Sequence, residues 1–132
     1  MALDPADTIA IQQLYAAYNH AADRGDGNTF GGCFTSDGRF DMGGTVAEGS
    51  EAIGKFAEQI PAMIPGARHI ATNVLVEGDG DRASGRAYLM LLDTKTSPPS
   101  IAMTGAYEDR LVRSANEWRF AERIFTVDAP SQ

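Results

Sequence analysis

Four long segments in the second half of the chain alternate apolar and polar residues. They span residues 69–77, 82–93, 100–113 and 117–127, and short connections rich in Gly, Pro, Ser and Asn separate them. A two-residue period predicts β-strands, and short connections predict that neighbouring strands run antiparallel. Such a sheet buries at least one face, so the first half of the chain must supply its cover.

The first predicted cover element is a helix over residues 5–24. Its apolar residues recur with a 3.6-residue period, which predicts one inward-facing stripe. Asp4 is expected to cap this helix, Pro5 to take its first position, and Gly25 to end it in a left-handed conformation.

Further local elements are predicted before the long strands begin. A short second helix, capped by Asp26 or Asn28, is followed by a hairpin over residues 39–48. A third helix is expected to be capped by Ser50 and stopped by Pro61. The second helix and the residues after it should bury Phe30, Cys33 and Phe34.

Helices grouped ahead of an antiparallel sheet predict the α+β class. We expect one domain over residues 1–132, with about three helices packed on a strongly curved, mostly antiparallel sheet. Gly85 and Gly105 lie inside the long strands, where they allow the sheet to bend. The predicted shape is a cone-shaped barrel with an apolar mouth.

Composition narrows the possible partners. The net charge is −7 and the basic residues are scattered, so no nucleic acid is expected to bind. The longest apolar run, residues 87–92, is too short to span a membrane, and the amino end lacks the pattern of a signal peptide. We therefore expect a cytoplasmic protein with no membrane partner.

Cysteine and histidine usage favours chemistry without a metal. Cys33 is the only cysteine, so it cannot form an internal disulfide, and its apolar neighbours indicate a small buried hydrophobe. The two histidines, His20 and His69, lack the spacing of metal ligands. The sequence predicts no metal site and implies no cofactor.

Asp23 is an unusual residue for the end of a helix. The C-terminal end of a helix carries partial negative charge, so a carboxylate there costs roughly 0.3–1 kcal/mol. A histidine whose ring is oriented by a carboxylate performs acid–base chemistry near pH 7. We therefore interpret Asp23, His69 and the inward-facing Tyr18 as catalytic residues.

Alternation along the first long strand predicts which side chains accompany His69. It places His69, Ala71 and Asn73 on the pocket side, and it assigns the opposite face to Ile70, Val74 and Val76. A small residue between two polar ones leaves room for a ligand. The remaining candidates are mostly apolar and predict an apolar, cyclic substrate. The predicted substrate-binding residues are Tyr15, Phe40, Met42, Phe56, Met63, Asn73, Met90, Met103 and Tyr107.

Several motifs follow one another along nearly the whole chain. They are Phe34-Thr35-Ser36-Asp37-Gly38-Arg39-Phe40, Glu48-Gly49-x-x-x-Ile53, Arg68-His69-x-x-x-Asn73, Gly105-x-Tyr107-x-Asp109 and Trp118-x-Phe120-x-x-Arg123. This order resembles SnoaL-like proteins of the nuclear transport factor 2-like superfamily, whose fold is a cone-shaped α+β barrel. The resemblance extends to scytalone dehydratase, bile-acid 7α-dehydratase and hexachlorocyclohexane dehydrochlorinase. It implies that Asp23 and His69 form the acid–base dyad of an elimination, assisted by Tyr18.

The predicted function is that of a small-molecule lyase with dehydratase-like elimination. One alternative is a ketosteroid-isomerase-like or cyclase-like isomerase in which Tyr18 helps to hold an oxyanion. In that pattern Met42 takes the position of the base, and Asp41 is one residue early, which turns a strand side chain to the opposite face.

Another alternative is a non-catalytic protein that binds a small ligand or serves as an assembly subunit. We also expect a homodimer or homotrimer, because outward positions on the long strands include apolar residues that would otherwise contact water.

Overall fold

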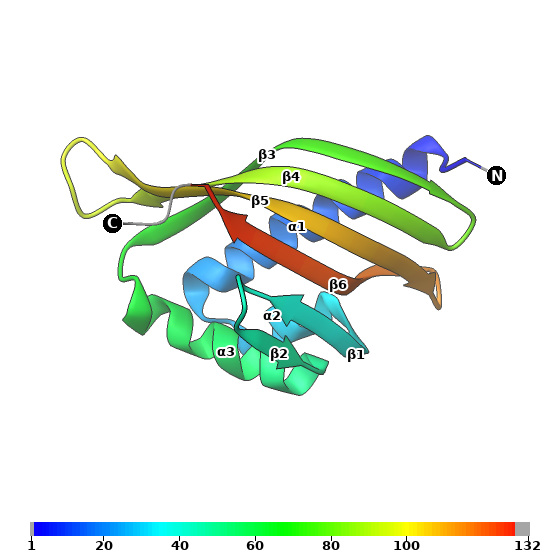
Figure 1. Ribbon diagram of the computed structural model, residues 1–132, viewed down its shortest axis with the longest axis horizontal. Helices are drawn as coiled ribbons and strands as arrows, with labels where there is room; N and C mark the ends of the chain where they lie inside the picture. Colours follow the sequence, from blue (N-terminus) through cyan, green and yellow to red (C-terminus); the bar gives the residue numbers. More distant parts are fainter. Residues whose placement is uncertain (1, 129–132) are drawn as a thin grey trace.

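The computed structural model describes residues 2–128, and its elements follow the predicted order of helices and strands (Figure 1). The bounds of β4 and β6 are those predicted. The elements are α1 (Pro5–Arg24), α2 (Gly27–Gly32), β1 (Phe34–Asp41), β2 (Val46–Glu48), α3 (Ser50–Met63), β3 (Ala67–Asp79), β4 (Arg82–Asp93), β5 (Ser100–Ser114) and β6 (Glu117–Val127).

The ends of α1 confirm the predicted caps. Oδ1 of Asp4 accepts the backbone N–H of Asp7 at 2.9 Å, and Pro5 is the first helical residue. Gly25 ends the helix with a φ of 69°, a left-handed conformation that glycine adopts without steric cost. The inward stripe is buried, and it includes Ile11, Tyr15, Tyr18 and Ala22.

Both predicted ends of α3 were wrong. Gly49, not Ser50, occupies the capping position, and no side chain caps the helix. Pro61 lies inside α3, which continues to Met63. A proline inside a helix removes one backbone hydrogen bond. Only two residues of α3 follow Pro61, so little of the helix lies beyond it.

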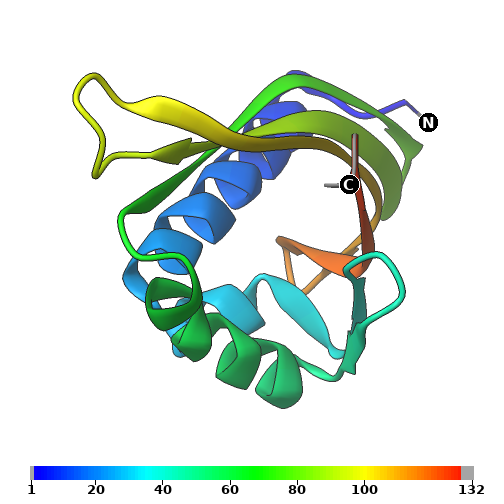
Figure 2. The same cartoon turned by 60° about the vertical axis from the view of Figure 1, so that its left-hand side comes forward.

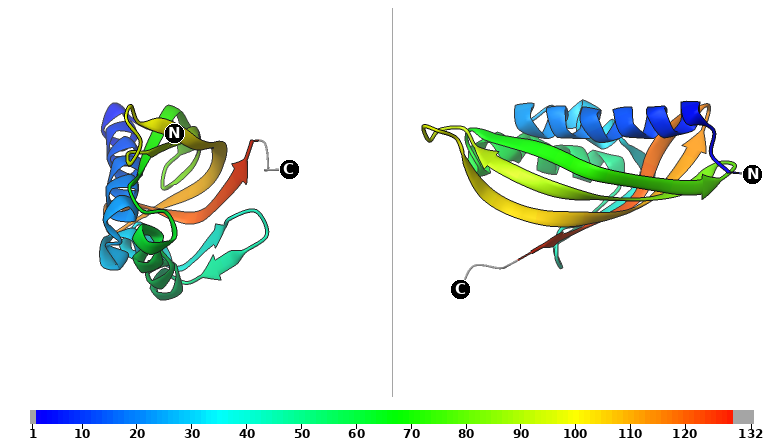
Figure 3. Two further views of the ribbon diagram at one scale, coloured as in Figure 1. Left: turned by 90° about the vertical axis from the view of Figure 1, so that its left-hand side faces the viewer. Right: turned by 90° about the horizontal axis from the view of Figure 1, so that it is seen from above.

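The sheet is open and mixed rather than a closed barrel. Its strand order is β2-β1-β6-β5-β4-β3, and β1 pairs with β6 in parallel while the other neighbours are antiparallel. Within the described residues, β2 and β3 are the two edges. The sheet curves around the helices, which cover its concave face (Figures 2 and 3). The α+β class is confirmed, and the helices complete the cone that the strands leave open.

A bulge in β3 corrects the predicted face assignment. Asn73 has a φ of 56°, and the pairing with β4 shifts register between Thr72 and Leu75. The extra residue reverses the alternation, because one added residue turns all later side chains to the other face. Asn73 is exposed, while Val74 and Val76 pack against the core on the same side as Ala71.

Aromatic side chains fill the space between the helices and the sheet. The ring of Tyr18 on α1 packs 4.4 Å from that of Phe30, measured between centroids, and also contacts the rings of Phe34 and Phe40. Cys33 is buried, as predicted. No helix within the described part of the chain is long and apolar enough to cross a membrane.

Candidate active site

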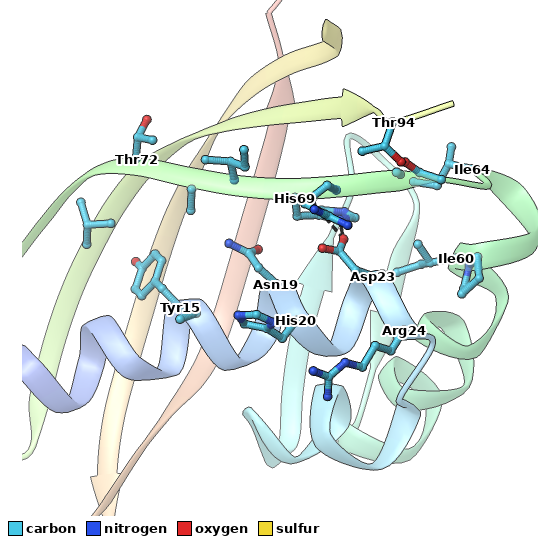
Figure 4. A pocket seen from close by; sticks show the side chains of 18 of the residues that line it. Tyr15, Asn19, His20, Asp23, Arg24, Ile60, Ile64, His69, Thr72 and Thr94 are labelled. Atoms are coloured by element: carbon cyan, nitrogen blue, oxygen red, sulfur yellow. Dashed lines mark hydrogen bonds and ion pairs between the residues drawn. The ribbon is translucent and has the colours of Figure 1, made fainter. Parts of the chain in front are cut away.

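Asp23 and His69 meet where the last turn of α1 approaches the start of β3 (Figure 4). Oδ1 of Asp23 lies 2.7 Å from Nδ1 of His69, and it also accepts the backbone N–H of His69 at 3.0 Å. The contact predicted between these two residues is therefore present. The second hydrogen bond gives the unfavourable helix-end carboxylate a structural role, because it joins α1 to β3.

This contact determines which nitrogen of His69 is available for chemistry. A carboxylate only accepts hydrogen bonds, so Nδ1 carries the proton that it shares with Asp23. Nε2 is then the unprotonated nitrogen of a neutral ring, and it has no hydrogen-bond partner among residues 2–128. The His69 and Asp23 side chains are 10% and 21% exposed, so a ligand can reach them although bulk water is largely excluded.

The dyad lies in a groove of about 960 Å³ between α1 and β3. Tyr15, Asn19 and Asp23 line it from α1, since residues four apart share one face of a helix. Residues of β3 form the facing wall, and Ile60 and Ile64 close the end near α3. The volume is sufficient for an organic molecule of several rings.

Tyr18 does not line this groove, contrary to its predicted role. Its side chain is buried in the core, where the guanidinium carbon of Arg123 lies 4.3 Å from the ring centroid. Burial raises the pKa of the Tyr18 phenol well above its ordinary value, and the neighbouring Tyr107 acts in the same direction. The phenol therefore remains protonated inside the core.

The predicted substrate-binding residues also fall into two groups, those that line the groove and those that lie elsewhere. Asn73 lines the groove, and so does Tyr15, which is also part of the buried core. Phe40 and Tyr107 belong to the core and do not line the groove. Three others pack against that core: Met42, Phe56 and Met103. Met63 is 55% exposed on the surface, and Met90 alternates with the buried Leu89 and Leu91 on the other face of β4. The difference arises because aromatic rings occupy the interior expected to hold the ligand.

A buried ion pair behind the groove was not predicted. Arg123 on β6 is fully buried, and its Nε donates to Oδ1 of Asp109 on β5 at 2.9 Å. The hydroxyl of Tyr15 donates to Oδ2 of Asp109, and a Cβ at Gly85 would collide with this hydroxyl. Burial raises the pKa of Asp109, and the Arg123 guanidinium opposes that shift. Tyr15 thus connects the groove to a charged pair in the core.

The sequence motifs in β5 and β6 contain both residues of this ion pair, and they were the one feature of the sequence that pointed to it. Tyr107, Asp109 and Arg123 all belong to the quoted motifs, but alternation alone does not show which face of the strand carries Tyr107 and Asp109. The pairing of Asp109 with Arg123 across β5 and β6 brings them together. The guanidinium carbon of Arg123 lies 3.5 Å from the ring centroid of Tyr107. The side chains of Tyr107 and Asp109 therefore both point inward from β5.

Asp41 and the distribution of possible metal ligands bear on the alternatives. Asp41 accepts the backbone N–H groups of Gly43 and Gly44 at 3.1 and 3.0 Å, so it caps the hairpin turn. Residues 2–128 bring together no group of three or more His, Cys, Asp and Glu side chains that could hold a metal ion.

Residues 5–124 match the profile of the SnoaL-like domain. This match covers most of the 132 residues, so the chain belongs to the SnoaL-like family. No curated protein is significantly similar to it in sequence.

Solved structures of similar proteins share the fold. Rv3472 from Mycobacterium tuberculosis, a protein of unknown function solved as an aspartate-to-asparagine variant, is 34% identical with a TM-score of 0.85, covering 95% of this chain and 76% of that one. A protein from Catenulispora acidiphila in complex with S-DNPA is 26% identical with a TM-score of 0.81, covering 94% and 95%. A scytalone dehydratase-like protein from Novosphingobium aromaticivorans is 22% identical with a TM-score of 0.80, covering 94% and 85%, and supports the fold alone.

Proposed function

We propose that this SnoaL-like protein is a lyase that eliminates water from an apolar, cyclic substrate. The observation that carries the proposal is the 2.7 Å contact between Oδ1 of Asp23 and Nδ1 of His69 at the wall of the groove. It leaves Nε2 as a base of fixed orientation in a site that is mostly shielded from water. General acid–base catalysis needs a group of this kind within reach of the substrate proton.

The proposed reaction uses His69 twice. Nε2 removes a proton from the carbon next to a substrate carbonyl, and the electron pair of that C–H bond forms the new double bond. The bond between the neighbouring carbon and its hydroxyl breaks, and the imidazolium returns the proton to the leaving oxygen as water. Asp23 holds the ring and stabilises its charged form between the two transfers.

The groove supports a small organic substrate. Tyr15, Ile60 and Ile64 are among the residues that line it, and the dyad lies in the same groove. The Catenulispora acidiphila relative was solved in complex with S-DNPA, so a ligand-bound state occurs within this fold. By extension we propose a small organic partner here, and a cytoplasmic location stays a prediction.

Cyclic β-hydroxyketones with one, two and three fused rings test this proposal. Incubation with the protein should produce the corresponding enones, detected by ultraviolet absorbance and by the mass of one lost water. Conversion without loss of mass would instead indicate an isomerase. Binding without conversion of any member would indicate a ligand-binding protein and contradict the proposal.

We further propose that the protein is a homodimer or homotrimer. Leu75 and Tyr88 on the outer face of the sheet are 60% and 59% exposed, and burial in a subunit interface would remove this apolar surface from water. Light scattering at micromolar concentration should give a multiple of the 14.1 kDa chain mass. The Leu75→Lys/Tyr88→Lys double variant should be monomeric, and a monomeric parent protein would refute the prediction.

A further inference from the structure

Asn19 is a buried amide whose side-chain oxygen has no hydrogen-bond partner among residues 2–128. It lies on α1 one turn from Tyr15 and one turn from Asp23, and its side chain lines the groove between them (Figure 4). The residue is only 8% exposed, and its Oδ1 is buried without a hydrogen bond. Buried side-chain oxygens nearly always have a partner, so this one requires an explanation.

The position of Asn19 places it beside the dyad. Side chains four residues apart on a helix have Cβ atoms roughly 5–6 Å from each other, and Asp23 in turn contacts His69. A ligand that reaches Nε2 of His69 therefore passes the Asn19 amide. The missing partner is then a polar group of that ligand.

We propose that Asn19 is a positioning residue that binds a hydroxyl group of the ligand. A hydroxyl suits the amide in either rotation about its terminal bond, because it both donates and accepts a hydrogen bond. The inference rests on the proposed function in one respect: if the protein eliminates water, the hydroxyl that Asn19 binds is the leaving group. Hydroxyl binding by Asn19 does not itself require turnover.

The unpartnered amide also predicts a change in stability. A buried polar group without a hydrogen bond destabilises the folded protein, whereas an apolar side chain of similar shape does not. Asn19→Leu should therefore raise the melting temperature of the ligand-free protein by about 3 °C or more. Gln13→Met is the matched control, because Gln13 is an exposed amide on the same helix and does not line the groove.

Three matched pairs of probes isolate the hydroxyl: cyclohexanol with cyclohexane, 1-indanol with indane, and 1-tetralol with tetralin. Binding is followed by NMR of the ¹⁵N-labelled protein, in which Asn19→Leu identifies the Asn19 side-chain signals by their loss. For at least one pair, the alcohol should shift these signals and bind about tenfold more tightly than the hydrocarbon. Asn19→Leu should bind both members equally, and Gln13→Met should retain the preference.

Several results would overturn the inference. One is that no pair shows a preference for the alcohol, and another is that the preference persists in Asn19→Leu. If Asn19→Leu does not fold, Asn19→Ala and the shifts of the wild-type amide signals decide the question. A preference that depends on Asn19, without elimination of water from any substrate, would refute the proposed function alone. Elimination with unchanged KM in Asn19→Leu would refute this inference alone.

Discussion

His69→Ala is expected to lower kcat by about 10²-fold or more on any β-hydroxyketone that the protein dehydrates. The imidazole both removes and returns the proton in the proposed reaction, so its loss removes both transfers. Asp23→Asn is expected to cause a loss of similar order, because an amide cannot stabilise the imidazolium. Its oxygen can still accept the backbone N–H of His69, which keeps α1 and β3 joined. Steady-state kinetics measure both effects.

Glu51→Gln provides the matched control for Asp23→Asn. Glu51 is an exposed carboxylate on α3 whose only ion pair among residues 2–128 is with Lys55 at 3.4 Å, so its conversion to an amide should leave kcat unchanged. Circular dichroism and the unfolding midpoint should show that all three variants are folded. Full activity in Asp23→Asn, with the fold intact, would remove Asp23 from the mechanism.

Arg123→Met is expected to lower the free energy of unfolding by about 3–5 kcal/mol. The substitution leaves the Asp109 carboxylate in the core without its cation, and burial already raises the pKa of this group. Urea denaturation measures the loss. Arg110→Met on the neighbouring strand β5 is the control, because Arg110 is exposed and its substitution should change stability by less than about 0.5 kcal/mol.

A double variant separates the charge from the packing of Arg123. Arg123→Met/Asp109→Leu removes both members of the pair, so no uncompensated charge stays buried. It should recover about 2 kcal/mol or more of the loss, since replacing a buried pair by apolar side chains is often nearly neutral. If the double variant is as unstable as Arg123→Met, packing around Tyr107 and Tyr18 rather than charge accounts for the effect.

Local patterns predicted the elements that depend on neighbouring residues alone. The bounds of β4 and β6 follow from alternation and from the turns beside them, and the ends of α1 follow from Asp4 and Gly25. The bulge at Asn73 could not be read in this way. A non-glycine residue with positive φ inside a strand depends on pairing with β4, which is a long-range contact.

In the candidate site, too, some features could be predicted from local sequence and others depend on long-range contacts. The dyad was predictable because Asp23 is unfavourable at a helix end and because the motif containing His69 resembles those of SnoaL-like proteins. The interior position of Tyr18 followed from the helical period, but its contact with Arg123 in place of a ligand did not, because the position of Arg123 in the core is set by the register of β5 and β6. The groove lies between α1 and the edge strand β3, so its lining could be defined only after the sheet order was known.

The proposed role of Nε2 as the base can be tested without a substrate, by measuring which nitrogen of the neutral His69 ring carries the proton. ¹⁵N NMR distinguishes the protonated nitrogen of a neutral imidazole from the unprotonated one. We predict that neutral His69 carries its proton on Nδ1, leaves Nε2 unprotonated, and loses this preference in Asp23→Ala, which removes the acceptor of the Nδ1 hydrogen bond. A neutral ring protonated on Nε2 in the wild-type protein would contradict this prediction, because the nitrogen assigned as the base would then have no lone pair to accept the substrate proton.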